Sequence, residues 1–165
     1  CGYESMKYIP QRIAKVYSTY ALVSEPLAEN ELWHQNSLVW ETATPYMYFR
    51  TIGDGRIVIG GKDDEFHRAN TTEATVRKKA RLLVDAFHKR MKHIQIKPDY
   101  YWSGAFAVTK DGLPYIGTIP EHPNTYFVLG YGGNGITFSV IAANIIHDFI
   151  CNKKNSDAAI FGFNR

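Results

Sequence analysis

This sequence has only two cysteines, no long apolar run and no strong excess of either charge. Its two cysteines, Cys1 and Cys151, lie near opposite ends of the chain and form no Cys-x-x-Cys motif or Cys/His cluster. We therefore predict reduced thiols, with neither a zinc site nor a disulfide framework. No apolar run reaches the roughly 20 residues of a transmembrane helix. We predict no transmembrane segment and a cytoplasmic location.

Charge is nearly balanced, which excludes several classes of partner. Nineteen Lys and Arg against 16 Asp and Glu give a formal net charge of +3, and the basic residues are scattered. A nucleic-acid-binding domain usually concentrates Lys and Arg on one face, so we predict no nucleic-acid partner. Hydrophobic residues make up 45% of the sequence and charged residues 21%, which excludes a disordered chain. The 165 residues form one domain or two small interleaved domains.

Histidines are few and dispersed. His67, His88 and His93 lack the paired spacing typical of a metal site, so we predict surface histidines and no metal. The chain also starts at Cys1 without a methionine. We therefore expect it to have been cut from a longer protein.

The first half of the sequence predicts antiparallel strands. Residues 13–23 are rich in Val, Tyr and Thr without Gly or Pro, which favours a long strand, and residues 38–41 favour a short one. Residues 46–52 and 56–60 predict a hairpin, because the Asp54-Gly55 pair between them suits a two-residue turn that needs positive φ.

Alternation along 46–52 places two sets of side chains on opposite faces of the predicted strand. Tyr46, Tyr48 and Arg50 share one face, and Met47 and Phe49 share the other. The apolar face is expected to pack in the core. The tyrosine and arginine face is either a solvent-facing surface or a wall that contacts substrate, and the periodicity does not decide between them.

An amphipathic helix is predicted over residues 71–91, packed on the sheet. Asn70 is placed as its N-cap, with Glu73 three residues later in a capping-box arrangement. The apolar stripe at helical spacing consists of Val76, Ala80, Leu83, Val84, Phe87 and Met91.

Residues 98–109 predict a strand with an unusual face. Trp102, Gly104 and Phe106 alternate on that face, so a gap lies between two aromatic rings. Such a gap suits close approach by another backbone or by a flat ligand, and a core strand with a bulge is equally compatible. An Asp111-Gly112 turn follows, and Pro114 makes the next extended piece an edge strand or a loop.

The stretch 126–150 predicts a strand, a glycine turn and a helix that is apolar nearly all round and hence buried. Four glycines in six positions allow positive φ and close approach to the main chain. Amides at the start of the helix suit a phosphate or an electron-rich ring. A tight turn that binds nothing is the alternative. The final residues 160–165 are expected to form a tail. Together these elements predict an α+β fold with a mostly antiparallel sheet.

Several linked motifs resemble one known family. Trp102-Ser103-Gly104, the segment 109–117, the segment 129–136 and Ala142-Ala143 follow one another as in the C-terminal half of the D-amino-acid oxidase and glycine oxidase family of FAD-dependent oxidoreductases. The 50–61 hairpin is similar to the hairpin of that family's substrate domain. Gly2-Tyr3-Glu4-Ser5 is similar to residues that follow the last phosphate-side strand of its FAD domain.

This resemblance implies an FAD cofactor and a fragment. The family binds the ADP half of FAD through an N-terminal βαβ unit with a G-x-G-x-x-G motif, and this sequence has no such unit. The resemblance implies that residues 1–10 end one FAD-binding segment, 11–109 form the substrate-binding domain and 110–165 return to complete the FAD-binding domain. The whole protein is expected to oxidise an amine or amino acid by hydride transfer to flavin, and this chain alone is expected to be inactive and to carry no FAD.

The resemblance also implies site residues. Cofactor contacts are expected from Gly104, Gly130, Tyr131, Gly132, Gly133, Asn134, Gly135, Ile136 and Thr137, and substrate contacts from Tyr48, Arg50, Trp102 and Phe106. Members that oxidise amino acids place an Arg where this sequence has Phe106, so the substrate is either an amine or an acid held by Arg50. No residue is assigned as a catalytic base.

Two other functions stay open. One is a non-catalytic binding or assembly domain that has kept the fold and lost the chemistry. The other is a free-standing phosphate-binding module built on residues 130–135.

Overall fold

A computed structural model describes residues 2–10, 12–67 and 71–165 of the chain. The chain divides into two compact units. Unit 1 comprises Cys1–Val16 and Phe106–Arg165, and unit 2 comprises Tyr17–Ala105. Both boundaries fall within long strands, β1 (Ala14–Ser24) and β5 (Pro98–Thr109).

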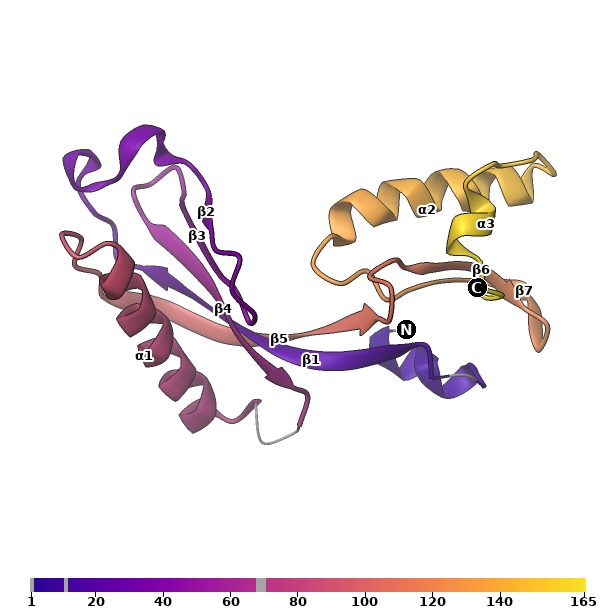
Figure 1. Ribbon diagram of the computed structural model, residues 1–165, viewed down its shortest axis with the longest axis horizontal. Helices are drawn as coiled ribbons and strands as arrows, with labels where there is room; N and C mark the ends of the chain where they lie inside the picture. The colour runs from indigo at the N-terminus through magenta and orange to yellow at the C-terminus, as the bar shows by residue number, and fades with distance from the viewer. Residues whose placement is uncertain (1, 11, 68–70) are drawn as a thin grey trace. The chain divides into compact units, whose positions relative to one another are not determined.

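Unit 2 is built on a five-stranded sheet in the order β2-β3-β4-β1-β5 (Figure 1). Strands β2 (Val39–Trp40), β3 (Met47–Thr51) and β4 (Ile57–Glu65) pair antiparallel in succession, and β4 pairs antiparallel with β1. The predicted hairpin is confirmed, because β3 and β4 pair antiparallel. Its turn is longer than the predicted two residues, since the Ile52 N–H donates to the Arg56 carbonyl at 2.9 Å and encloses residues 53–55, of which Gly55 has a φ of +79°. Two short 3-10 helices, η2 (Glu29–Glu31) and η3 (His34–Asn36), precede β2.

The two faces of β3 differ as the alternation predicts. Met47 and Phe49 are buried in the core, whereas Tyr46 and Tyr48 are half-buried and Arg50 is exposed. We call the face of the unit 2 sheet that carries Tyr46 and Tyr48 the outer face.

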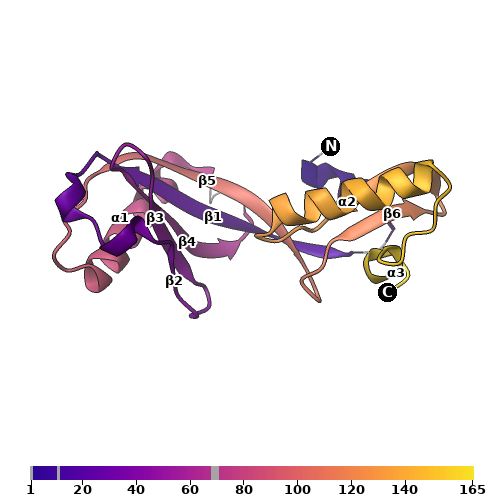
Figure 2. The same cartoon turned by 90° about the horizontal axis from the view of Figure 1, so that it is seen from above.

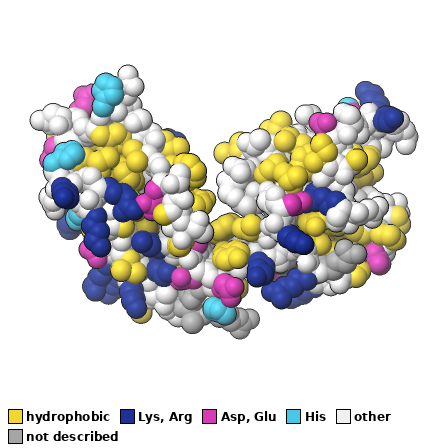
Figure 3. Space-filling view, in the orientation of Figure 1, with side chains coloured by type: hydrophobic (Ala, Val, Ile, Leu, Met, Phe, Trp, Pro, Cys, Tyr) yellow, Lys and Arg dark blue, Asp and Glu magenta, His cyan; other side chains and the backbone are white. Residues whose placement is uncertain are grey.

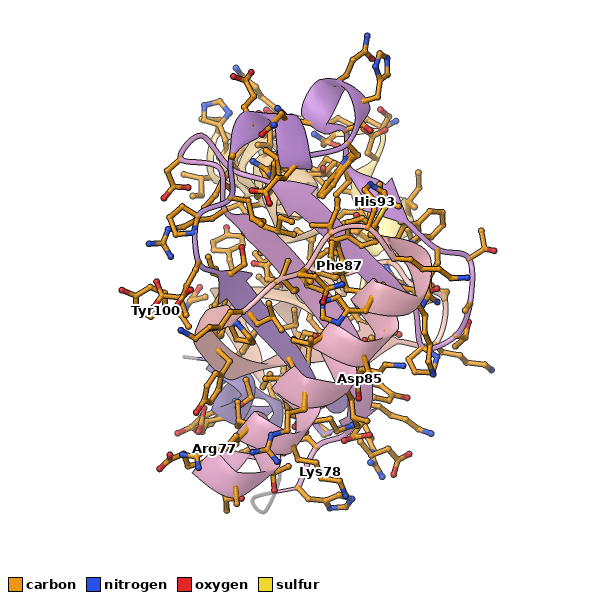
Figure 4. The ribbon with its side chains drawn as sticks, turned by 90° about the vertical axis from the view of Figure 1, so that its left-hand side faces the viewer. Arg77, Lys78, Asp85, Phe87, His93 and Tyr100 are labelled. Carbon is orange, nitrogen blue, oxygen red and sulfur yellow. The ribbon has the colours of Figure 1, made fainter. Side chains whose placement is uncertain are left out.

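Helix α1 (Glu73–Arg90) packs on the core face of the sheet. In Figure 4, Arg77, Lys78 and Asp85 lie on this helix, and Phe87 is fully buried. The core beneath the helix includes Tyr20, Leu22, Met47, Phe49, Ile57, Ile59, Val76, Ala80, Leu83 and Phe87.

The cap of α1 differs from the prediction. Thr72 is the N-cap, and its side chain accepts a hydrogen bond from the Thr75 N–H at 3.4 Å. Asn70 lies outside the described residues. Glu73 is the first helical residue rather than the third, because three candidate cap residues follow one another here and sequence spacing does not choose between them.

Unit 1 combines a two-stranded hairpin with helices. Strands β6 (Tyr115–Ile119) and β7 (His122–Leu129) pair antiparallel. Helix α2 (Gly135–Ile150) lies along this hairpin (Figure 2), followed by the short helix α3 (Ala158–Phe161). A 3-10 helix, η1 (Gly2–Tyr8), lies near the start of the unit.

Helix α2 is not buried all round, contrary to the prediction. Its buried residues are Ala142 and Ile145, which pack with Ile116 of β6. The side chains of Ile136 and Val140 are 89% and 62% exposed. Hydrophobic side chains gather over α2 in Figure 3. The sequence shows that this helix is apolar on all sides, but only the tertiary structure shows that one side is covered.

The C-terminal residues do not form a free tail, which corrects another prediction. Phe161 is buried against α2 and β6. The Arg165 guanidinium pairs with Asp111 at 2.9 Å and lies over the Tyr115 ring at 4.0 Å from the centroid. It also donates to the carbonyl oxygens of Leu113, Pro114 and Ile160. Residues 158–165 are therefore an integral part of unit 1.

The structure confirms an α+β fold with a mostly antiparallel sheet. Within the described ranges, no helix is both long and apolar enough to span a bilayer. The same ranges contain no group of three potential metal-ligating side chains. Cys151 is a free, exposed thiol, and its Sγ lies 3.6 Å from His147 Nε2, one helical turn earlier.

Candidate functional site

The glycine turn between β7 and α2 lies entirely within unit 1. Gly130 and Gly132 have φ angles of +78° and +57°, which only glycine adopts readily. These backbone conformations explain why two of the four residues in the turn that are glycine must be glycine.

Gly130 and Gly132 have different roles. A Cβ on Gly130 would lie 2.5 Å from Thr109 Cγ2, so this residue is a glycine because the chain packs tightly on β5. By contrast, a Cβ on Gly132 or on Gly135 would meet no atom within 4 Å. The open space that a ligand requires therefore lies at Gly132 and Gly135 rather than at Gly130.

Fewer amides of the turn are free than the sequence suggested. The Gly132 N–H donates to the Ala107 carbonyl at 2.9 Å, and the Asn134 N–H donates to Tyr131 at 3.2 Å. The first helical hydrogen bond of α2 is donated by Phe138 to the Asn134 carbonyl.

The first turn of α2 nevertheless offers donors. The N–H groups of Gly135, Ile136 and Thr137 precede that first bond and have no partner within the helix. The Asn134 side chain does not cap them. These three amides lie at the positive end of the helix dipole, equivalent to about half a charge, and can donate to an anionic or electron-rich group.

A cavity of about 500 Å³ lies beside the turn. It is lined by Gly2, Ser5, Ala14, Ala107 and every residue from Thr125 to Gly132. Successive side chains of a strand point to opposite faces, so a cavity that touches each residue in turn follows the edge of β7. The volume lies in the range of small-molecule and cofactor sites, about 300–1,000 Å³.

Sequence reasoning identified part of this lining and missed the rest. Gly130, Tyr131 and Gly132 were predicted cofactor contacts and do line the cavity. Ala14, Ala107 and the strand residues before Gly130 were not predicted, because mainly apolar side chains within strands are typical of a core and carry no chemical signal of a ligand site. The early Gly2 and Ser5 were noted by resemblance but were not assigned to a site.

The predicted substrate residues are divided between the units. Tyr48, Arg50 and Trp102 belong to unit 2, and Phe106 is the residue with which the second segment of unit 1 begins. Arg50 is exposed, and its Nε donates to the Thr51 carbonyl at 3.4 Å. The Trp102 side chain is 46% exposed.

Gly104, a predicted cofactor contact, lies in unit 2 on β5. It is exposed, and a Cβ there would lie 3.8 Å from Thr19 Cγ2, which is ordinary contact. Its φ is not in the left-handed region, so unit 2 by itself does not require glycine at this position.

Tyr48 and Asp63 are two of the groups in unit 2 whose pKa is shifted. Burial raises the pKa of Tyr48, and the neighbouring Tyr46 and Asp63 raise it further. Burial also raises the pKa of the Asp63 carboxyl, an effect opposed by a hydrogen bond with Thr19 and by the Lys79 charge. Perturbed acidic groups of this kind are enriched at functional sites. Asp63 was not among the predicted site residues, because nothing in its sequence surroundings distinguishes it.

The histidines provide no evident catalytic group. His67 and His93 are exposed as predicted, but His88 is half-buried, and its Nε2 accepts a hydrogen bond from the Ile96 N–H at 3.3 Å. The prediction of a surface role for His88 was therefore wrong, because its ring bridges α1 to the segment before β5.

The sequence matches the family model described as FAD dependent oxidoreductase over residues 3–148. Among curated proteins, glycine oxidase of Bacillus subtilis (strain 168) is 33% identical over 104 residues, which are 61% of this chain and 27% of that protein. Gamma-glutamylputrescine oxidoreductase of Escherichia coli (strain K12) is 27% identical over 136 residues, 80% of this chain and 30% of that protein. The chain spans less than a third of the length of these relatives.

Two solved structures share the fold of this chain. L-proline dehydrogenase from P. horikoshii has a TM-score of 0.69 at 19% identity, covering 96% of this chain and 42% of that chain. Glycine oxidase from Geobacillus kaustophilus has a TM-score of 0.65 at 20% identity, covering 92% and 40%. At such identities the likeness shows a shared fold.

Proposed function

This chain belongs to the family of FAD dependent oxidoreductases, and we propose that it forms the substrate-binding part and one segment of the FAD site in an enzyme that oxidises an amine or amino acid. FAD, when bound, supplies the hydride acceptor for this oxidation. What this chain supplies is the binding and orientation of the cofactor edge and of the substrate. On this account the 165 residues alone carry no activity.

The open first turn of α2 is the observation that carries the proposal. The amides of Gly135, Ile136 and Thr137 lack helical partners, and Gly132 and Gly135 leave space beside them. Donors at a helix N-terminus favour an electron-rich group, and a flavin ring gains negative charge on its pyrimidine edge when it is reduced. Placed there, these residues stabilise the reduced cofactor by charge and by hydrogen bonding.

The cavity along β7 supports the same assignment. Its lining is mainly apolar and includes small residues such as Gly2, Ala14, Ala107 and Gly132 as well as the larger residues of β7. The glycines among them leave the main chain accessible to a bulky ligand. We assign this cavity, together with the turn 130–137, to cofactor binding.

We further propose that residues 1–10 and 110–165 belong to the FAD-binding domain, and that 11–109 form the substrate-binding domain. The division into units supports this, since its boundaries at residues 16–17 and 105–106 lie within a few residues of the proposed ones. The exposed apolar side of α2, with Ile136 and Val140, is the surface on which we place the rest of the FAD-binding domain. Burying such side chains stabilises by about 25 cal/mol per Å².

Arg50 is the proposed anchor if the substrate has a carboxylate. It is exposed, and neither an ion pair nor a hydrogen bond to another side chain is recorded for it among the described residues. Phe106 stands where the amino-acid-oxidising members of the family place an arginine, so an uncharged contact is expected there. We therefore place Tyr48, Arg50, Trp102 and Phe106 around the substrate. The cytoplasmic location stays a prediction.

The test uses the protein encoded by the complete reading frame. We expect it to purify with FAD and to lose flavin absorbance when mixed anaerobically with amines or amino acids, whereas the 165-residue chain should be colourless. Arg50→Met should raise KM for substrates with a carboxylate by about tenfold or more, since pairs in a closed site are worth 2 kcal/mol or more, and should leave simple amines unaffected. A complete protein that retains no flavin under any condition would support the non-catalytic alternative.

A further inference from the structure

Three aromatic rings form a cluster on the outer face of unit 2. The Trp40 and Tyr46 ring centroids are 6.1 Å apart with an interplanar angle of 68°, and those of Tyr46 and Tyr48 are 6.0 Å apart at 40°. Trp40 lies opposite Tyr48 across the β2–β3 pairing and is 60% exposed. We call these three residues the aromatic cluster.

The position of Tyr48 is fixed by a glycine on the neighbouring strand. A Cβ on Gly60 would lie 2.3–2.8 Å from atoms of the Tyr48 ring. Tyr48 pairs with Gly60 across β3 and β4, so its ring lies directly on the β4 backbone. Any other residue at position 60 would displace the ring. The cluster therefore has a defined shape before anything binds to it, which lowers the entropic cost of binding.

A carboxylate supplies the charge beside the cluster. In the segment Asp63-Asp64, Asp64 is paired with Lys79 at 2.5 Å, and Lys79 also donates to the Lys62 carbonyl at 2.9 Å. Asp63 is the second acid of the group, and the Lys79 charge and a hydrogen bond with Thr19 stabilise its charged form only in part, because burial still raises its pKa. Asp63 Oδ1 is buried and has no hydrogen-bond partner among the described residues, and the charge of Asp63 acts on the Tyr48 hydroxyl. Asp63 therefore adds a negative contribution at Tyr48, beside the larger effect of burial on that hydroxyl.

The positive charge on the same strand lies further away. Arg50 is four residues beyond Tyr46, which in an extended strand corresponds to about 13 Å. An anionic group is therefore expected near Arg50, and a cationic group near Tyr46. The preferred positions of an anionic and a cationic group therefore lie at opposite ends of the outer face of β3.

We propose that the aromatic cluster and Asp63 form a binding site for an organic ammonium group, which on the proposed function is the cationic end of the substrate. Aromatic rings carry negative charge on their faces and attract a cation within about 6 Å of the ring centroid. The nearby carboxylate adds a longer-range attraction. An ammonium with alkyl substituents suits this site best, because the methyl groups contact the rings while the charge stays within reach of Asp63.

Choline and its neutral carbon isostere, 3,3-dimethylbutan-1-ol, separate this proposal from simple apolar binding. We expect choline to shift the NMR resonances of Trp40, Tyr46 and Tyr48 in the 165-residue chain. The isostere should bind ~3- to 30-fold more weakly, the range set by typical cation–π energies. Asp63→Asn should weaken choline binding severalfold, while Asp85→Asn, which removes an exposed acid from α1, should leave it unchanged.

Equal affinity for choline and the isostere would overturn the proposal, as would equal effects of the two Asp variants. Far-UV circular dichroism checks the fold of each variant. If Asp63→Asn does not fold, Trp40→Leu takes its place, because Trp40 is exposed on a two-residue edge strand and its loss should abolish the choline shifts. Flavin takes no part in this titration. Flavin reduction by amines in the complete protein, combined with no choline binding here, would reject the ammonium site and leave the proposed function intact.

Discussion

Replacing Gly130 by Ala tests the structural account of the turn in energetic terms. An alanine at a φ of +78° costs about 1–2 kcal/mol. Its Cβ would also lie 2.5 Å from Thr109 Cγ2, so Thr109 must rotate. Rotation breaks the hydrogen bond from Thr109 Oγ1 to the Leu113 carbonyl, 2.8 Å, which is worth about 1 kcal/mol. We expect Gly130→Ala to lower the free energy of unfolding of unit 1 by about 2–3 kcal/mol.

The two contributions can be separated by a second substitution. Thr109→Ser removes the methyl group that causes the clash and keeps the hydroxyl. The double variant should therefore recover about 1 kcal/mol relative to Gly130→Ala, leaving the backbone term. All three tryptophans lie in unit 2, so tryptophan fluorescence does not report on unit 1. The unfolding of unit 1 is measured instead by hydrogen exchange of residues 110–150 in a urea series, read by mass spectrometry. A loss below 0.5 kcal/mol for Gly130→Ala, or no recovery in the double variant, would refute this reasoning.

Two further predictions concern the packing of each unit. Burial, followed by the Asp64 charge, raises the pKa of Tyr20 to about 12. This folded pKa exceeds the unfolded value of about 10, so the neutral hydroxyl stabilises unit 2 below pH 10. About 2–3 kcal/mol of that stabilisation is lost between pH 10 and 12. Tyr20→Phe should make the urea midpoint of unit 2, followed by tryptophan fluorescence, fall less steeply across that interval, and parallel pH curves for the two proteins would contradict this. Arg165→Ala should destabilise unit 1 by about 2–4 kcal/mol, because the guanidinium is largely buried between Asp111 and the Tyr115 ring. If hydrogen exchange of residues 110–150 is identical in the variant and the parent chain, these contacts do not stabilise unit 1.

Local chemistry in the sequence was sufficient for several elements. The Asp54-Gly55 pair specifies a turn that needs positive φ, and alternation on either side of it specifies which side chains are buried, so both the β3–β4 hairpin and its apolar face were predictable. Strand β5 was predicted with the bounds observed, 98–109. Helix periodicity placed α1, although its exact cap did not follow from spacing.

Features that depend on non-local contacts could not be predicted in the same way. The apolar composition of α2 shows that it needs covering on all sides, but composition does not show that Ile136 stays exposed in this chain. Helix α3 is four residues long and too short for a periodic signal. The relation of Tyr48 to Gly60 and Asp63 depends on strand register and on the irregular backbone at Lys62, whose φ is +60°. The candidate site therefore emerged in part from the sequence and in part only from the fold.

FAD retention by a matched pair of glycine variants tests the central claim most directly. Gly132 and Gly112 both have positive φ, +57° and +77°, and a Cβ on either would meet nothing within 4 Å. Valine at either position therefore imposes a similar backbone cost. The two variants differ in that only position 132 lies at the proposed cofactor-binding turn. In the protein from the complete reading frame, we expect Gly132→Val to weaken FAD binding by tenfold or more and Gly112→Val to leave it near the parent value. Equal FAD affinity in the two folded variants would contradict the placement of the cofactor at this turn.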